Sequence, residues 1–408
     1  MSSFTLSDAW KRARSGAVRR AAFEAVSDAV AVDAALPREP RPAGIQHDQV
    51  VWVTTPARID LAGGWTDTPP ISLERGGSVV NAAVTLNGQY PLQVMAKLNT
   101  RGTIRLTSID LGERVEMRDT ADLLDHENPR HWAALPKAAL VLAGIGPGSG
   151  RQSLARWLKV LGGGLDLTLF SALPKGSGLG ASSILGAACL ACLSRVRGET
   201  PSRERLIRMT SVLEQRMRTG GGWQDQVGGL TPGIKLIRTR PGTDQKPHIR
   251  SLAFPVAWKE RLLLYYTGQK RLARGILENV VWRYLQREPA TLETLDGLST
   301  SGARMAEALT ERNFDAFVRE IERYWTLKKR IDAGATNDGI EALLARTARW
   351  TAARVLPGAG GGGFVLFVAE DAARARRIRR ELEARPGSEQ ARFFDFSIDD
   401  DGLKMAVL

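Results

Sequence analysis

The feature that most constrains the fold is a glycine-rich stretch, residues 174–183, that separates a strand-like run from a helix-like run. Its sequence is Pro-Lys-Gly-Ser-Gly-Leu-Gly-Ala-Ser-Ser, with the strand-like run at residues 165–173 before it and the helix-like run at residues 184–196 after it. Glycines without a Cβ let consecutive backbone N–H groups turn toward an anion, and a following helix adds its positive N-terminal end. The stretch therefore indicates a phosphate-binding loop, while a tight turn with a serine cap is the competing interpretation.

Other phosphate-binding and hydrolytic patterns are excluded by their spacing. The Walker pattern needs Gly-Lys followed by Ser or Thr, and the chain contains no Gly-Lys pair. The dinucleotide fingerprint G-x-G-x-x-G does not fit, because the glycines here repeat as G-x-G-x-G. A serine-hydrolase elbow is absent. His126 and His131 are five apart with Pro129 between them, which excludes a helical zinc-protease motif.

Two further segments place glycine where loops of fixed shape are needed. Residues 56–70 begin as an alternating strand and end in a loop that carries Trp65 and Asp67. This pair suits a sugar, because a carboxylate accepts hydrogen bonds from hydroxyls while an indole covers the apolar C–H face. A structural turn capped by Asp67, with Trp65 buried, is the alternative. Residues 358–363 are a glycine run between apolar segments, so we expect a pinned loop rather than a linker.

The order of apolar patterns predicts an α+β fold in two halves. The chain has 408 residues, 43% of them hydrophobic and 25% charged, which is typical of globular proteins. Residues 1–45 predict a peripheral helical extension and a Pro-rich connector. Strand-like runs come first, at residues 50–54, 78–84, 92–97 and 103–108, and helices then alternate with strands to about residue 255. Within this part, Thr200 before Pro201 predicts the start of a helix over residues 201–218. Long helical patterns follow at residues 272–286, 291–309 and 314–331. Asp401-Gly402 predicts a hairpin before the last strand. Since no apolar run approaches the ~18 residues that span a bilayer, we expect a soluble, cytoplasmic protein.

The net charge of +13 raises the question of a polyanionic partner. Its densest run, residues 374–380, follows two acidic residues and predicts a solvated surface helix. Because no aromatic residues interleave with these arginines, we expect neither nucleic acid nor membrane as a partner. Cys189 and Cys192 are three apart in an apolar run, which favours two core residues over a redox or zinc pair.

The three glycine segments resemble, in chain order, motifs 1, 2 and 3 of the GHMP kinase superfamily. Residues 62–70 (Ala-Gly-Gly-Trp-Thr-Asp-Thr-Pro-Pro), 219–229 (Thr-Gly-Gly-Gly-Trp-Gln-Asp-Gln-Val-Gly-Gly) and 266–274 (Tyr-Thr-Gly-Gln-Lys-Arg-Leu-Ala-Arg) are similar to the fucokinase branch. The resemblance implies a ribosomal-protein-S5-like N-terminal domain over residues 46–255. It implies a ferredoxin-like C-terminal domain over residues 256–408, with ATP and sugar meeting between the two.

The resemblance also implies roles for individual residues. Asp225 would take the proton from the sugar hydroxyl, with Arg58 beside it as a second catalytic residue. Ser183 and Glu214 would hold Mg²⁺. Trp65, Asp67, Gly361 and Gly362 would bind the sugar. The phosphates of ATP would lie against Lys175, Gly176, Ser177, Gly178, Leu179, Gly180, Ala181, Ser182 and Ser183.

The implied reaction is the ATP-dependent conversion of L-fucose to fucose 1-phosphate. Galactokinases carry Glu-His where this chain has Gly64-Trp65, which disfavours galactose. A 1-kinase for D-arabinose or a heptose phosphate stays open, and so does a sugar and ATP sensor without turnover. The positive charge favours a phosphorylated sugar. Heptose-phosphate kinases, however, usually have a Gly-Gly-Gly-Thr-Asp loop, and Trp65 replaces its third glycine here, which disfavours a heptose phosphate. We expect no fused nucleotidyltransferase, because the chain is too short to hold one.

Overall fold

The computed structural model describes residues 40–124, 131–146, 153–217, 219–269 and 273–408. The helical extension expected within residues 1–45 lies almost wholly outside these residues. Helices and sheets alternate and segregate as the two-half α+β pattern predicts, and this fold class is confirmed. The strands expected near residues 50–54, 78–84, 92–97 and 103–108 are all present.

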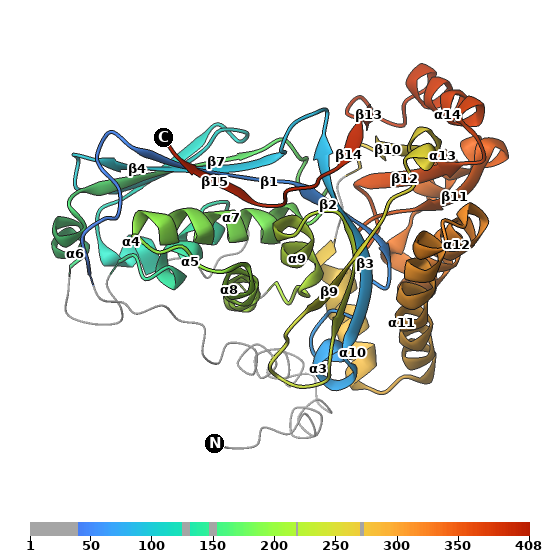
Figure 1. Cartoon of the computed structure of the whole chain (residues 1–408), viewed down its shortest axis with the longest axis horizontal. Helices are drawn as coiled ribbons and strands as arrows, with labels where there is room; N and C mark the ends of the chain where they lie inside the picture. The colour runs from blue at the N-terminus through green and yellow to red at the C-terminus, as the bar shows by residue number, and fades with distance from the viewer. Residues whose placement is uncertain (1–39, 125–130, 147–152, 218, 270–272) are drawn as a thin grey trace.

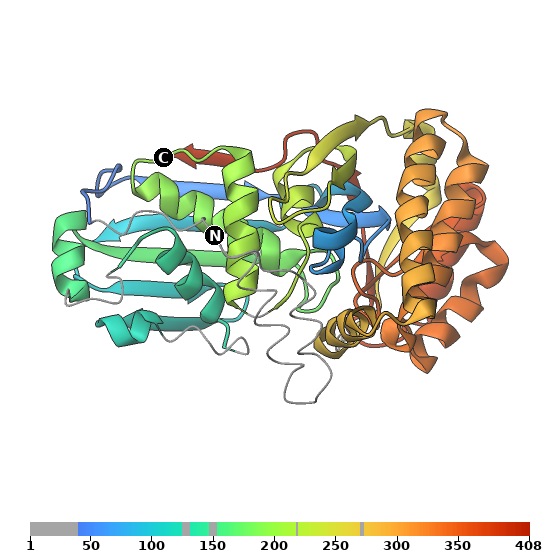
Figure 2. The same ribbon diagram turned by 90° about the horizontal axis from the view of Figure 1, so that it is seen from below.

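A six-stranded sheet forms the outer layer of the first half. Its spatial order is β15 (Lys404–Val407), β1 (Val50–Thr55), β4 (Leu92–Asn99), β7 (Gly164–Ser171), β5 (Ile104–Ser108) and β6 (Glu113–Met117). One face is covered by helices, as Figures 1 and 2 show, and the helix that follows the phosphate loop packs on β1 and β4. These helices are α4 (Thr120–Leu124), α5 (Ala134–Leu142) and α7 (Ala181–Val196), with α8 (Arg203–Arg216) packed on α5 and α7, while α6 (Leu154–Leu161) lies at one end.

A five-stranded sheet lies between this layer and the second half. Its members are β14 (Phe396–Ile398), β3 (Gly77–Leu86), β8 (Ile234–Thr239), β9 (His248–Leu252) and β2 (Ala57–Ala62), which pairs with β3. The short helices α3 (Ile71–Arg75) and α9 (Gln224–Leu230) adjoin it. Strand β2 is buried along its whole length. Its two charged side chains, Arg58 and Asp60, therefore need partners inside the protein.

The second half has a four-stranded antiparallel sheet with helices around it. The strand order is β11 (Thr351–Val355), β12 (Phe364–Ala369), β10 (Leu262–Tyr266) and β13 (Arg392–Phe394). The helices are α10 (Ala273–Leu285), α11 (Pro289–Thr310), α12 (Phe314–Ile331), α13 (Asp338–Thr347) and α14 (Ala372–Ala384). Helices α11 and α12 lie side by side (Figure 2) and contact β2, so one hydrophobic core runs through both halves.

The end of the chain returns to the first half. Strand β14 pairs with β3, and β15 pairs with β1 in the six-stranded sheet. The expected assignment of residues 256–408 to one C-terminal domain therefore does not describe the last strands. The expected hairpin at Asp401-Gly402 is also wrong, because the strands on either side of this turn join different sheets. Gly402 has a φ of 76°, so the turn itself is present.

The structure shows where the arginine run, the two cysteines and the helix expected from Pro201 lie. The arginine run is the exposed face of α14, whose N-cap is Asp371. Cys189 and Cys192 are buried free thiols on α7, and burial raises the pKa of the Cys189 thiol to about 12. The helix expected from Pro201 begins instead at Arg203, because the Ser202 hydroxyl, rather than Thr200, accepts the capping bond from the Arg205 amide.

Candidate active site

The loop between β7 and α7 has the backbone that its glycines predict. Gly176, Gly178 and Gly180 have φ values of 74°, 80° and 77°, in the left-handed region that L side chains rarely adopt. A Cβ on Gly178 would lie 2.5 Å from the carbonyl oxygen of Pro357. Helix α7 begins directly after Gly180, so its first-turn N–H groups project from the end of this loop. The loop and the helix N-terminus together can receive a phosphate.

Arg58 and Asp225 form the central ion pair. The Arg58 Nη2 and Nε atoms lie 2.6 Å and 2.8 Å from the same oxygen, Oδ1 of Asp225. Strand β2 supplies the arginine and helix α9 the aspartate, whose side chain is 26% exposed while that of Arg58 is 3% exposed. Burial lowers the pKa of Arg58, but Asp225 and Asp60 more than offset this effect, so its pKa is raised. The pair is a fixed cation beside a carboxylate that solvent can reach.

The glycine loop touches this ion pair directly. Nη1 of Arg58 donates to the carbonyl of Gly178 at 2.7 Å, and the Arg58 amide donates to Leu179 at 3.2 Å. A Cβ on Gly180 would lie 3.2 Å from Cβ and Cγ of Asp225. An anion bound at the loop would therefore lie next to both the guanidinium and the carboxylate.

A second buried carboxylate, Asp60, connects Arg58 to helix α12. Asp60 accepts from Nη1 of Arg58 at 3.2 Å and from the Tyr324 hydroxyl at 2.6 Å, and Nζ of Lys328 lies 3.4 Å away. It also accepts from the Gly358 amide at 2.7 Å. Burial raises the pKa of Asp60, yet Lys328 and Arg58 outweigh burial and hold this pKa below its ordinary value. Asp60 thus joins β2, α12 and the glycine run.

Ser183 and Glu214 are brought together as the sequence predicts. The Ser183 hydroxyl donates to Oε1 of Glu214 at 2.8 Å, and the Thr219 hydroxyl donates to Oε2. Both Ser183 and Glu214 are buried, and burial raises the pKa of Glu214 in spite of these hydrogen bonds. One carboxylate and one hydroxyl fit Mg²⁺, which keeps several waters and substrate oxygens in its shell. In the described residues no cluster of three or more acidic, His or Cys side chains offers a fuller metal cage.

Asp67 lies within the same site but is more deeply buried than expected. Its carboxylate accepts from the amide and from Nε2 of Gln224, at 3.2 Å and 2.9 Å. Burial first and the neighbouring Asp225 second raise the pKa of Asp67 to about 7. Trp65 has a φ of 79° and its indole packs in the core, with 6% of the residue exposed. The sugar-binding roles of Asp67 and Trp65 stay predictions.

The glycine run at residues 358–363 packs against the phosphate loop. The Phe364 amide donates to the carbonyl of Ser177 at 3.1 Å, and a Cβ on Gly363 would lie 2.4 Å from that oxygen. The Gly361 amide donates to Ala335 at 2.6 Å. The run is therefore the pinned loop that its position predicts, and sugar binding by Gly361 and Gly362 stays a prediction. Of the phosphate-loop residues, Lys175, Gly176 and Ser182 are exposed.

The sequence reasoning missed three buried partners of the site: Asp60, Tyr324 and Lys328. Tyr324 and Lys328 fall on the apolar stripe of α12 with Phe317, Ile321 and Ile331, one or two helical turns apart. A lysine in such a stripe, and an aspartate two residues after Arg58 in an otherwise apolar strand, were the available signals. Gln224, which binds Asp67, gave no comparable signal.

Two family models match the chain, and both include parts of this site. The GHMP kinases N terminal domain matches residues 151–231, and the GHMP kinases C terminal domain matches residues 305–388. The first range holds the phosphate loop, Glu214 and Asp225. The second holds Lys328 and the glycine run. None of the described helices is both long and apolar enough to cross a membrane.

Relatives and solved structures agree with these matches. The chain is 38% identical over 395 residues to an L-fucokinase/L-fucose-1-P guanylyltransferase of Bacteroides fragilis, covering 95% of this chain and 42% of that protein. It is 36% identical over 335 residues to a bifunctional fucokinase/GDP-fucose pyrophosphorylase of Arabidopsis thaliana, covering 81% and 31%. The chain thus spans less than half the length of either relative. The fold is shared with a D-glycero-D-manno-heptose 1-phosphate kinase from Bacteroides thetaiotaomicron, at a TM-score of 0.63, 20% identity, and 87% and 98% coverage.

Proposed function

The chain belongs to the GHMP kinase family, and from that premise we propose that it is an ATP-dependent sugar 1-kinase acting on L-fucose. The observation that carries this proposal is the Arg58–Asp225 pair beside the N-terminus of α7. It sets a solvent-reachable carboxylate next to a phosphate-type loop. Both relatives above are named as fucokinases, which supports L-fucose as the sugar.

In the proposed reaction Asp225 accepts the proton of the sugar C1 hydroxyl. The sugar oxygen forms a bond to the γ-phosphorus of ATP, the bond to the β-phosphate oxygen breaks, and ADP leaves. Arg58 fixes the orientation of Asp225 through two nitrogens and offsets negative charge on the transferred group. Asp60, in turn, holds Nη1 of Arg58 and so acts as a positioning residue.

The phosphates of ATP would lie against the loop of residues 175–183 and the first turn of α7. Ser183 and Glu214 are the residues that would hold Mg²⁺, which supplies positive charge to the triphosphate when bound. Because burial raises the pKa of Glu214, a bound cation would stabilise the ionised form of this carboxyl. Since ATP is the second substrate, we place the reaction in the cytoplasm.

The sugar would lie on the Asp67 side of the site, with Trp65, Gly361 and Gly362 nearby. Coupled ADP release across a panel of L-fucose, D-arabinose, a heptose phosphate and D-galactose tests the proposal. We expect the highest kcat/KM with L-fucose. Turnover of a heptose phosphate alone would replace the sugar assignment. Binding of ATP and sugar with no ADP release would favour a sensor.

A further inference from the structure

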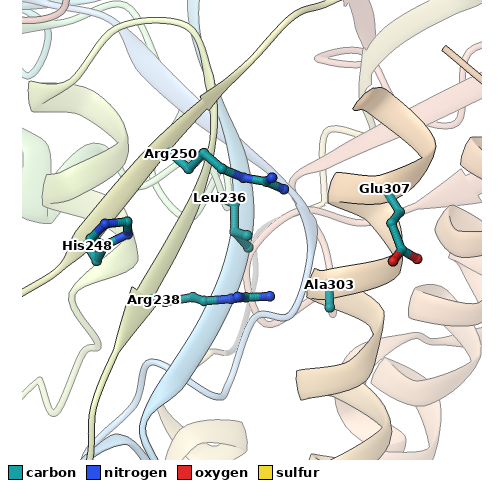
Figure 3. A pocket seen from close by; sticks show the side chains of 6 residues that line it. All are labelled: Leu236, Arg238, His248, Arg250, Ala303 and Glu307. Atoms are coloured by element: carbon teal, nitrogen blue, oxygen red, sulfur yellow. The ribbon is translucent and has the colours of Figure 1, made fainter. Parts of the chain in front are cut away.

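A hollow of about 310 Å³ lies away from the catalytic pair, between strands β8 and β9 and helix α11. Figure 3 shows the side chains of Arg238 and Arg250 extending from the two strands toward this helix, which carries Glu307 on the other side. Leu236 and Ala303 complete the apolar part of the wall.

The register of the sheet explains why these cations gather. Residues directly opposite each other in an antiparallel pair point to the same face. Arg238 lies opposite His248, and Arg250 lies opposite Leu236, so the three basic side chains occupy one face of two adjacent strands. That face is the one Leu236 shares with the core that includes α11. Strand β9 ends the sheet, which leaves this corner open to solvent.

Arg238 and Arg250 are both exposed to solvent, and neither has its charge balanced by another of the described side chains of the protein. Within the part of the chain that the structure describes, the guanidinium groups of Arg238 and Arg250 have no ion-pair partner, and Glu307 has none either. This contrasts with Arg58, Arg283 and Arg287, each of which pairs with a carboxylate. Like charges on adjacent strands repel, and a bound anion would relieve the part of this repulsion that solvent does not screen.

We propose that this hollow is a second binding site, for a small phosphomonoester that carries hydroxyl groups. Two guanidinium forks match the oxygens of a phosphate group, and His248 offers another polar contact. Glu307 on the facing wall would accept hydrogen bonds from the hydroxyls. The volume suits a ligand of hexose phosphate size, at the lower end of ordinary small-molecule pockets.

The position of the site gives it a route to the proposed sugar loop. Arg238 lies opposite Ser78 of β3, whose amide donates to Oγ1 of Thr66 at 3.0 Å. Thr66 in turn donates to the carbonyl of Gly63 at 2.7 Å, and a Cβ on Gly63 would lie 1.9 Å from the Ser78 carbonyl oxygen. A ligand that shifts Arg238 and its strand would therefore act on residues 63–67. We expect it to change sugar affinity, and by linkage sugar would change its affinity equally.

Calorimetry with glucose 6-phosphate tests the site, with Mg²⁺ and a non-hydrolysable ATP analogue kept saturating so that the nucleotide phosphates are occupied. We expect one binding event, weakened about 10-fold or more in Arg238→Gln/Arg250→Gln. The charge-matched control Arg114→Gln/Arg156→Gln removes two exposed arginines elsewhere and should stay within two-fold of wild type. Melting curves confirm that all variants are folded.

Three results would overturn the site: no binding to the wild type at millimolar concentration, equal weakening in the control, or loss of binding in Asp67→Asn, which would place the ligand in the sugar site. The coupling, which rests on the proposed function, is tested by L-fucose binding with and without glucose 6-phosphate. An unchanged dissociation constant overturns the coupling. If L-fucose does not bind at all, the proposed substrate fails while the phosphate site still stands on its own titration.

Discussion

Arg58 is held by two carboxylates that do different work. Asp60 is fully buried and fixes one end of the guanidinium, whereas Asp225 is partly exposed and free on its outer side to meet a substrate. Because one carboxylate fixes the guanidinium and the other can reach a substrate, the buried Arg58 can be rigid and still orient the proposed base. It also separates Asp225, the proposed catalytic residue, from Asp60, a positioning residue.

Asp225→Asn is the substitution that addresses the proposed base. The amide keeps the shape of the side chain but cannot accept the proton, so kcat for L-fucose should fall about 10²-fold or more. The dissociation constants of ATP and sugar should change little. Asp244→Asn, at an exposed turn, serves as the control and should behave like wild type. Near wild-type kcat in Asp225→Asn would show that the residue is structural.

Asp67 should make stability depend on pH. Its pKa rises from an ordinary 3.8 to about 7 in the folded chain, so the folded state holds this proton more tightly than the unfolded state. The resulting stability is present at low pH and is lost as pH rises through this interval. Asp67→Asn cannot ionise, so its melting temperature relative to wild type should increase between about pH 4 and pH 7. Melting temperatures that change in parallel across this range would contradict the burial argument.

Among the elements, the phosphate loop and the glycine run form one unit. Gly178 packs on Pro357, Gly363 packs on Ser177, and the Gly358 amide binds Asp60. The first two contacts need a residue that has no Cβ, and the third needs a backbone amide at a fixed place. The two glycine segments therefore constrain each other across the two halves of the chain.

Gly180→Ala and Gly88→Ala separate backbone strain from contact with the site. Both glycines have a positive φ, 77° and 75°, so both substitutions carry a similar strain of about 1–2 kcal/mol. Only at residue 180 would the new Cβ press on Arg58 and Asp225, since nothing lies within 4 Å at residue 88. We expect kcat to fall about 10-fold or more in Gly180→Ala and to stay near wild type in Gly88→Ala. Equal kcat values would mean that the loop does not position the pair.

Local sequence patterns predicted the elements whose formation depends on residues close together in the chain. Glycine spacing located all three loops, and apolar periodicity located α7, α11 and α12, because both signals act within a few residues. The hairpin at Asp401-Gly402 failed for the opposite reason. A turn signal carries no information about which distant strand, β3 or β1, each neighbour joins. The start of α8 was misplaced by competition between two nearby capping residues, Thr200 and Ser202.

At the scale of the whole molecule, Lys328 ties the two halves together. Its ammonium group donates to the carbonyls of Leu356 and Gly358 and lies 3.4 Å from Asp60. Lys328, Asp60 and Leu356 are buried, and Gly358 is half-buried. Local patterns mark Lys328 and Asp60 separately as charged residues among apolar ones, but they cannot pair the two, because α12 and β2 are more than 250 residues apart in the chain. The site is therefore a property of the assembled halves.

Lys328→Met should destabilise the chain by about 3–5 kcal/mol, since it leaves the buried Asp60 without one of its cations. Its neighbour Lys329 is 38% exposed and pairs with Glu341 at 3.8 Å, so Lys329→Met should cost less than about 1 kcal/mol. Urea unfolding measures both. Equal unfolding free energies for the two variants would show that Lys328 does not hold the halves together.

In the proposed reaction this chain moves the γ-phosphate of ATP to the anomeric oxygen of L-fucose. The most direct measurement is a ³¹P NMR spectrum of the chain with ATP, Mg²⁺ and L-fucose. We expect signals of ADP together with a new phosphomonoester signal coupled to the proton on C1 of the sugar. A spectrum in which ATP persists, or in which the new phosphate couples to a different sugar proton, would contradict the proposed reaction.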